Sequence, residues 1–195
     1  GSTAASAAFV INKSTGTMTC SDSRTASSVS IINSGGVSFS NTVTAGTVTL
    51  TDTTGTIAFS GDVSITTSLS TAPNGYNVSF NAGAGGQTAS VAGTTTFNNT
   101  GTLTLGNNAA DTITFTGGVI ATAPLAVNTA GTVVTGGGAG QDINLGDGDT
   151  GVVLAAATTL DTGSGDITLG GTVSGAFALT LTAGGGTVAV ASTNG

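Results

Sequence analysis

The chain has almost no positive charge. Lys13 and Arg24 are its only basic residues, set against nine aspartates and no glutamate, and there is no histidine; the formal net charge is −7 over 195 residues. Two cations cannot neutralise a run of nucleic-acid phosphates or hold the chain to an anionic membrane surface. No apolar run approaches the roughly 20 residues that a membrane helix needs. We therefore predict neither a nucleic-acid partner nor membrane insertion.

Cysteine is nearly absent as well. Cys20 stands alone, so a disulfide framework and a cysteine-pair metal site are both excluded. A catalytic thiol would need a basic partner such as histidine, and the chain has none. We predict that Cys20 is a small core residue that points inward in alternation with Met18.

The residues that favour helices are also scarce, because there is no glutamate and only two lysines or arginines. Threonine, valine, serine and glycine dominate instead, and threonine and valine favour strands. Disordered chains have few apolar residues and much charge, whereas this one is 38% hydrophobic and only 6% charged. The composition therefore predicts an ordered all-β protein.

The stretch "GTVTLTDTTGTIAF" at residues 46–59 contains the same phrase twice: Gly-Thr followed by apolar residues that alternate with small polar ones. Alternation with a period of two places the apolar residues on one face of a strand. Similar phrases return along the chain. The residues that we predict to point inward are Val48, Leu50, Ile57, Phe59, Leu103, Leu105, Ile113, Phe115, Ile167 and Leu169, and we expect Phe39, Phe80 and Phe97 to be core residues too.

A longer repeat is also visible. Residues 46–65 align with residues 101–121, and a third copy begins near residue 165. A unit of 55 to 64 residues, divided into three rungs, predicts rungs of roughly 19 residues. Repeats of this kind indicate a solenoid, because one rung cannot bury its own apolar face and must stack on the next. A parallel β-helix is therefore the predicted fold, and a β-sandwich is the alternative.

The run "GTLTLGNNAADTITFTGGVIATAPLAVNTAGTVVTGGG" and the later "TTLDTGSGDITLGGTVSG" resemble the β-strand repeats of filamentous-haemagglutinin-like proteins. The resemblance covers residues 41–195 and leaves residues 1–40 as an N-terminal cap or adjoining module. It implies a right-handed β-helical shaft from a large bacterial adhesin that is secreted or held at the cell surface. The secretion-domain signature of such proteins is not visible, so we expect the chain to be a segment of a longer protein.

One stretch raises the question of calcium. "GGAGQDINLGDGDTG" at residues 137–151 resembles the Gly- and Asp-rich calcium turns of repeat toxins, where carboxylates and carbonyls supply hard oxygen ligands. The match is partial, because Asn144 stands where an apolar residue is expected and no second nonapeptide follows. The candidate calcium ligands are Asp142, Asp147 and Asp149. No other cofactor is predicted.

Two further functions remain open. The acidic cluster of residues 142–166, which includes Asp161 and Asp166, supplies carboxylate pairs of the kind that glycosidases use, although turn-forming aspartate explains it equally well. Threonine pairs that bracket one apolar residue also resemble the water-ordering ranks of ice-binding solenoids. The pairs are Thr17/Thr19, Thr42/Thr44, Thr47/Thr49, Thr102/Thr104, Thr112/Thr114 and Thr180/Thr182.

The function that we expect from sequence is a non-enzymatic stalk or fibre segment of a bacterial adhesin, extracellular or on the cell surface. Its partners would be a cell surface, a glycan or further copies of itself. Self-association follows from the open sheet edges that a solenoid presents at its ends, where nothing in "GGGTVAVASTNG" supplies the charge or proline that usually protects an edge. We expect head-to-tail stacking that is weak and concentration-dependent.

Overall fold

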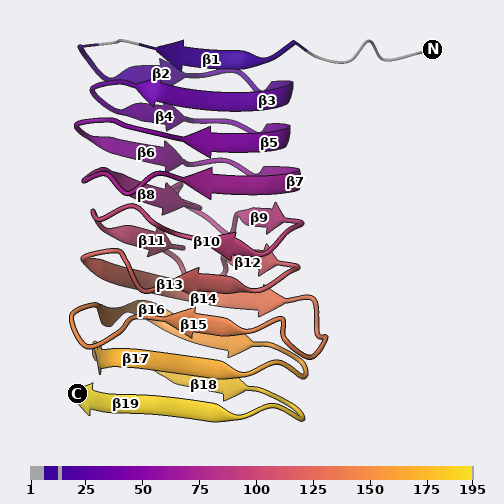
Figure 1. Ribbon diagram of the computed structural model, residues 1–195, viewed down its shortest axis with the longest axis vertical. Coiled ribbons are helices and arrows are strands. Elements are labelled where there is room, and N and C mark those ends of the chain that lie inside the picture. Colours follow the sequence, from indigo (N-terminus) through magenta and orange to yellow (C-terminus); the bar gives the residue numbers. More distant parts are fainter. Residues whose placement is uncertain (1–6, 13–14, 195) are drawn as a thin grey trace.

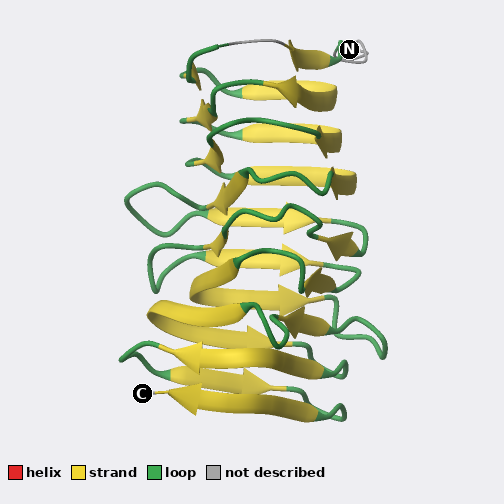
Figure 2. Cartoon of the chain, turned by 60° about the vertical axis from the view of Figure 1, so that its left-hand side comes forward, coloured by secondary structure: helices red, strands yellow, loops and turns green. Residues whose placement is uncertain are grey.

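The described part of the chain is a column of stacked coils built from strands and turns (Figures 1 and 2). The computed structural model describes residues 7–12 and 15–194, and these form 19 strands in one continuous sheet. Every strand pairing in it is parallel, as in a β-solenoid of about nine turns. The predicted parallel β-helix is therefore confirmed, and the β-sandwich alternative is wrong.

Each coil has three faces. Face 1 begins with β1, face 2 with β2 and face 3 with the first half of β3, and later coils repeat this order. Twelve short strands lie on a single face: β1 Phe9–Asn12, β2 Met18–Cys20, β4 Val37–Phe39, β6 Thr56–Phe59, β8 Asn77–Phe80, β9 Thr88–Val91, β10 Thr95–Thr96, β11 Leu103–Leu105, β12 Thr112–Phe115, β13 Val119–Ala121, β15 Ile143–Leu145 and β18 Leu179–Thr182.

Longer strands bend around a corner and so belong to two faces. They are β3 Arg24–Asn33, β5 Val43–Leu50, β7 Val63–Thr71, β14 Ala126–Thr135, β16 Gly151–Asp161, β17 Ile167–Ser174 and β19 Val188–Asn194. In β14 the pairing register shifts at the bend, between Thr129 and Gly131. Gly131 has a φ of 75°, and an added Cβ would lie 2.4 Å from the carbonyl oxygen of Asp111. Glycine is required there because both the backbone conformation and the space exclude a side chain.

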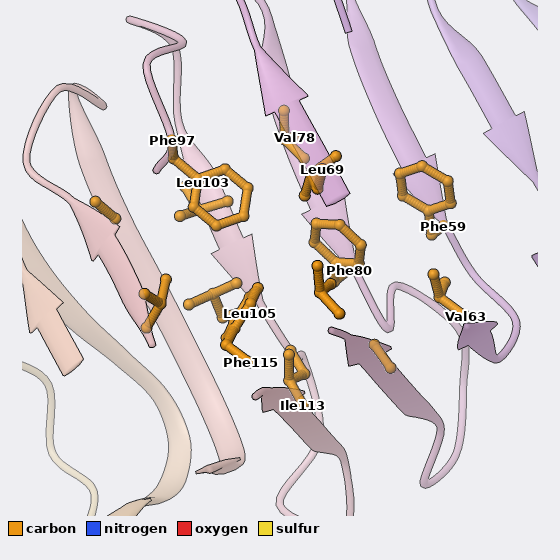
Figure 3. Packing of buried hydrophobic residues seen from close by; sticks show 14 of the residues in the cluster. Phe59, Val63, Leu69, Val78, Phe80, Phe97, Leu103, Leu105, Ile113 and Phe115 are labelled. Atoms are coloured by element: carbon orange, nitrogen blue, oxygen red, sulfur yellow. The ribbon is translucent and has the colours of Figure 1, made fainter. Parts of the chain in front are cut away.

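The core fills the inside of the column. All ten residues predicted from alternation to point inward are at most 1% exposed. Register stacks like upon like: Phe39 pairs with Phe59, and Phe59 pairs with Phe80. Their rings are parallel within 8° and 11°, with centroids 5.1 and 5.0 Å apart. Figure 3 shows Phe59 and Phe80 within the cluster, with Phe97 and Phe115 beyond them.

Cys20 is also buried, as predicted, whereas Met18 is 37% exposed in the first coil. Strands β1 to β4 lie in the same sheet as the rest, because β1 pairs with β3 and β2 pairs with β4 in parallel register. The described strands of the segment that the sequence assigned to a cap or adjoining module therefore belong to the same stack of coils.

The coils are longer than predicted. A coil contains about 21 residues instead of 19. Val43 pairs with Val63, a step of 20 residues, but Ile143 pairs with Ile167, a step of 24. The extra residues lie in turns at the corners, and the alternation of apolar and polar residues gives no information about the length of these turns. The 55-residue repeat consequently relates strands on different faces: Val48 lies on face 1 and Leu103 on face 2.

Candidate functional site

The aspartates proposed from sequence as calcium ligands lie at two different corners. Asp147 and Asp149 share the exposed turn after β15, where Oδ1 of Asp147 accepts hydrogen bonds from the backbone N–H groups of Asp149 and Thr150, both at 3.0 Å. Asp142 precedes β15, at the opposite end of that strand. At about 3.3 Å per residue, the two corners are about 15 Å apart. The structure therefore brings Asp147 and Asp149 together but not Asp142.

Asp142 instead joins one coil to the next. Its Oδ1 accepts a hydrogen bond from the backbone N–H of Asp166, the residue one coil later, at 2.8 Å. Asp166 repeats the arrangement and accepts from the N–H of Thr187 at 2.7 Å. This bond is the main reason why the pKa of the Asp166 carboxyl is lowered from its ordinary value of 3.8. The carboxylates at this corner thus act as acceptors for backbone groups.

The remaining acidic residue of the cluster, Asp161, accepts a hydrogen bond from the N–H of Gly163 within its own turn. Within residues 7–12 and 15–194, no three side chains of the types that usually ligate metals come together. The carboxylates of the acidic cluster are spread over several turns. Four of them accept hydrogen bonds from backbone N–H groups: Asp142, Asp147, Asp161 and Asp166.

Sequence reasoning missed the most buried carboxylate. Asp111 is 1% exposed, and its oxygens accept three backbone hydrogen bonds at 2.9 Å, from Gln87, Asn107 and Asn108. The bond from Gln87 crosses to the neighbouring coil, while the other two close the local turn. Both carboxylate oxygens are thereby satisfied by backbone N–H groups. Asp111 is therefore a structural anchor for two turns at once.

Tyr76 is a second buried polar group that the sequence did not single out. Its hydroxyl oxygen lies 2.8 Å from the carbonyl oxygen of Leu50 and 3.1 Å from that of Ala72, and the hydroxyl donates to both. Burial raises the pKa of Tyr76 to about 12. The only tyrosine of the chain thus satisfies carbonyl groups of two successive coils at one corner.

The threonine pairs predicted from sequence to order water do not all lie on one face. Thr47/Thr49 lie on face 1, Thr102/Thr104 on face 2 and Thr112/Thr114 on face 3. Face 3 nevertheless carries an unbroken column of outward threonines in five successive coils: Thr88, Thr112, Thr132, Thr159 and Thr180. The parallel column two residues along is mixed, because Val134 and Asp161 interrupt its serine and threonine positions.

The two ends of the column differ. At the first coil, Arg24 occupies a core position, because it pairs in register with the buried Val43. Its guanidinium lies over the ring of Phe9 at 5.4 Å, and its Nε is buried without a hydrogen-bond partner among the described residues. Nearby Ile11 is only 3% exposed. A cation and an aromatic ring thus cover this end.

The last coil leaves its inward positions open. Val188 and Val190 of β19 are 48% and 38% exposed, whereas Ile167 and Leu169, which they pair with one coil earlier, are fully buried. Leu179 and Leu181 of β18 are partly buried, and Phe177 is 52% exposed. We call these five residues the open end. It consists of apolar side chains and unpaired strand edges.

Three surface hollows have volumes of about 110, 170 and 290 Å³. The smallest lies beside Asp142 and Gly118, the second lies at the open end beside Phe177 and Leu179, and the largest lies beside Arg24. Pockets for small organic ligands usually span about 300 to 1,000 Å³.

Comparisons with protein-family models, with curated proteins and with solved structures each gave no match. Among the described residues no helix is suited to span a membrane.

Proposed function

We propose that this chain is a rigid, non-catalytic spacer: a stalk segment of a bacterial adhesin that is secreted or held at the cell surface. The observation that supports the proposal is the single 19-stranded sheet, which includes every strand from β1 to β19 and encloses one hydrophobic core cluster. About nine turns at about 4.8 Å each make a column about 43 Å long. Such a column holds what lies at its two ends at a fixed separation.

The polar residues support a structural role. Asp111, Asp142 and Asp166 each use their carboxylates to bind backbone N–H groups of a neighbouring coil. Tyr76 and the stacked Phe59 connect coils in the same way from inside the column. These side chains stabilise the stacking of coils, which is what a spacer under load requires. The bacterial and extracellular assignment rests on the resemblance of the repeats, and a cell surface or a glycan is the proposed external partner.

Single-molecule pulling tests the load-bearing role. The chain is held by its two ends and stretched, and the extension is recorded as it unfolds. Because a solenoid gains stability from contacts between neighbouring coils, we expect unfolding in steps of one or a few coils, each about 70 Å of chain for about 21 residues. Unfolding at loads too small to distinguish from those of an unstructured chain would overturn the spacer.

A panel of acidic and neutral polysaccharides tests the non-catalytic part. We expect no cleavage of any of them. Cleavage that is lost when Asp147 and Asp149 are both replaced by asparagine, while the circular dichroism spectrum is unchanged, would contradict the proposal and place a carboxylate reaction at that turn.

The threonine column of face 3 favours a second candidate function, which is ice binding. Its five hydroxyl-bearing side chains repeat with the spacing of the coils, about 4.8 Å. The test is ice recrystallisation inhibition by the wild type and by Thr132→Tyr, which would interrupt the column at its middle. The matched control is Thr104→Tyr on face 2. Inhibition that is lost only in Thr132→Tyr supports this function, and no inhibition by the wild type removes it.

A further inference from the structure

Three exposed asparagines at the corners of the column connect one coil to the coil before it. The Nδ2 atom of each donates to a backbone carbonyl oxygen 20 to 27 residues earlier in the chain: Asn41 to Ser21, Asn74 to Thr51 and Asn98 to Thr71. The bond from Asn74 is 2.7 Å long. The three side chains therefore have the same structural role, and they differ in the residue that follows each of them.

The residue that follows an asparagine governs its chemical stability. The backbone nitrogen of that residue can attack Cγ of the asparagine side chain and close an imide ring, and asparagine is one of the thermolabile residues of proteins. Asn41 is followed by Thr42, whose branched Cβ crowds the attacking nitrogen. Asn74 is followed by Gly75, which has no Cβ and leaves the backbone free to turn toward Cγ. Of the three asparagines, Asn74 is therefore the most reactive.

The segment between β7 and β8 exposes this reactive pair to water (Figure 1). Asn74 and Gly75 are both exposed, and a Cβ added to Gly75 would meet no atom within 4 Å beyond its neighbours in the chain. The pair Asn-Gly occurs once more in the sequence, at residues 194–195, but residue 195 lies outside the described residues. At residues 74–75 the structure thus brings together an asparagine, a following glycine and access for water.

We propose that Asn74 is a site of spontaneous deamidation, and that the reaction weakens the contact between coils at this corner. Hydroxide removes the proton of the Gly75 N–H as the nitrogen bonds to Cγ of Asn74. The bond from Cγ to Nδ2 breaks, and Nδ2 takes a proton from water and leaves as ammonia. The inference goes beyond the proposed spacer function and does not depend on it.

Hydrolysis of the imide completes the reaction and gives two products. Water that adds at Cγ breaks the new bond to the Gly75 nitrogen and leaves an aspartate in an unchanged backbone. Water that adds at the backbone carbonyl breaks the original peptide bond instead, so that the chain continues through the side chain as isoaspartate. In both cases the net reaction consumes water and releases ammonia, with no other reactant.

The modified residue would lie at the corner that Tyr76 anchors. The Tyr76 hydroxyl donates to the carbonyl oxygens of Leu50 and Ala72, beside the bond from Asn74 to Thr51. A carboxylate at position 74 has no N–H to donate, and it places an oxygen opposite the carbonyl oxygen of Thr51. For a chain of this size, the loss of one such hydrogen bond should lower the melting temperature by about 2 to 4 °C.

Mass spectrometry of aged protein tests the reaction. The folded wild type is incubated in water labelled with heavy oxygen, at neutral and at mildly alkaline pH, and is then digested with pepsin in acid. We expect Asn74 to be converted from amide to acid with uptake of labelled oxygen, faster at alkaline pH because the attacking nitrogen must lose its proton. Asn41 and Asn98 are internal controls with the same kind of hydrogen bond and should keep their amides.

Two results of this assay would overturn the proposal. One is conversion of Asn41 and Asn74 at equal rates, which would mean that Gly75 has no influence. The other is an intact Asn74 in the folded protein at a time when a synthetic peptide of residues 71–79 has been fully converted, which would mean that the fold protects the site.

Two variants separate the reaction from its structural consequence. Gly75→Ala should keep the fold, because Gly75 is outside the left-handed region and an added Cβ has open space. Conversion of Asn74 in this variant should fall to the level of Asn41, and conversion at the wild-type rate would overturn the mechanism. Asn74→Asp imitates one product and should melt about 2 to 4 °C below the wild type. An unchanged melting temperature would overturn the weakening of the corner.

Discussion

Phe59 offers the sharpest test of how the coils are held together. Its ring is fully buried and lies between Phe39 and Phe80, with both centroids about 5 Å away. Truncating a buried phenylalanine to alanine costs about 3–5 kcal/mol through lost burial and the cavity left behind. Each lost ring pair adds about 0.5–1.5 kcal/mol. We expect Phe59→Ala to lower the free energy of unfolding by about 5 kcal/mol.

The measurement is urea unfolding followed by far-UV circular dichroism. Phe115→Ala is an internal comparison, because Phe115 is equally buried but meets only one ring, that of Phe97, edge-on at 5.9 Å. Its loss should be smaller by about 1 kcal/mol. Leu125→Ala, on a turn, should change stability by less than about 0.5 kcal/mol. A loss below about 2 kcal/mol for Phe59→Ala, or equal losses at Phe59 and Leu125, would refute the stacked core.

Four further predictions concern the polar residues. Tyr76→Phe should lower the free energy of unfolding, measured in urea, by about 1–2 kcal/mol. Because the pKa of Tyr76 is raised to about 12, the stability of the wild type should fall above pH 10, and the stability of the variant should not. Asp111→Asn should cost about 2–3 kcal/mol in the same assay, since an amide N–H₂ then faces a backbone donor; a neutral result would contradict its anchoring role. Because the pKa of Asp166 is lowered in the folded protein, its contribution to stability should be constant above about pH 4 and disappear as the pH falls through the lowered value. The melting temperatures of Asp166→Asn and the wild type should therefore converge in acid. The melting temperature should be the same in millimolar calcium and in chelator. The candidate calcium ligands are Asp142, Asp147 and Asp149. A melting temperature that rises with calcium in the wild type, but not when all three are replaced by asparagine, would establish a calcium site.

The alternation of apolar and polar residues was sufficient to predict which side chains form the core. It worked because a strand that is buried on one side must show a period of two, as Ile113 and Phe115 do. The length of a coil was not predictable in the same way. Turns such as residues 81–87 and 107–111 vary in length without disturbing the strands on either side, so the repeat along the sequence does not follow the repeat in space.

The candidate site was predicted less well, for a physical reason. The sequence places Asp142, Asp147 and Asp149 close together, but a strand of three residues between them is extended and separates them. The role of aspartate as an acceptor for the backbone of the next coil, as in Asp142 and Asp166, depends on contacts about 21 to 24 residues apart. A glycine before each of Asp62, Asp166 and Thr132 hints at a corner, but it does not identify the hydrogen-bond partner.

The central claim is that this chain is a rigid column whose length is set by its number of coils. Deleting residues 44–63 removes one coil in register, because Val43 pairs with Val63. Spin labels at Asp22→Cys and Asp149→Cys, on a Cys20→Ala background, report the distance along the column by pulsed electron resonance. We predict one narrow distance distribution that shortens by about 4 to 5 Å in the deletion variant. A broad distribution, or a distance that the deletion leaves unchanged, would contradict the account.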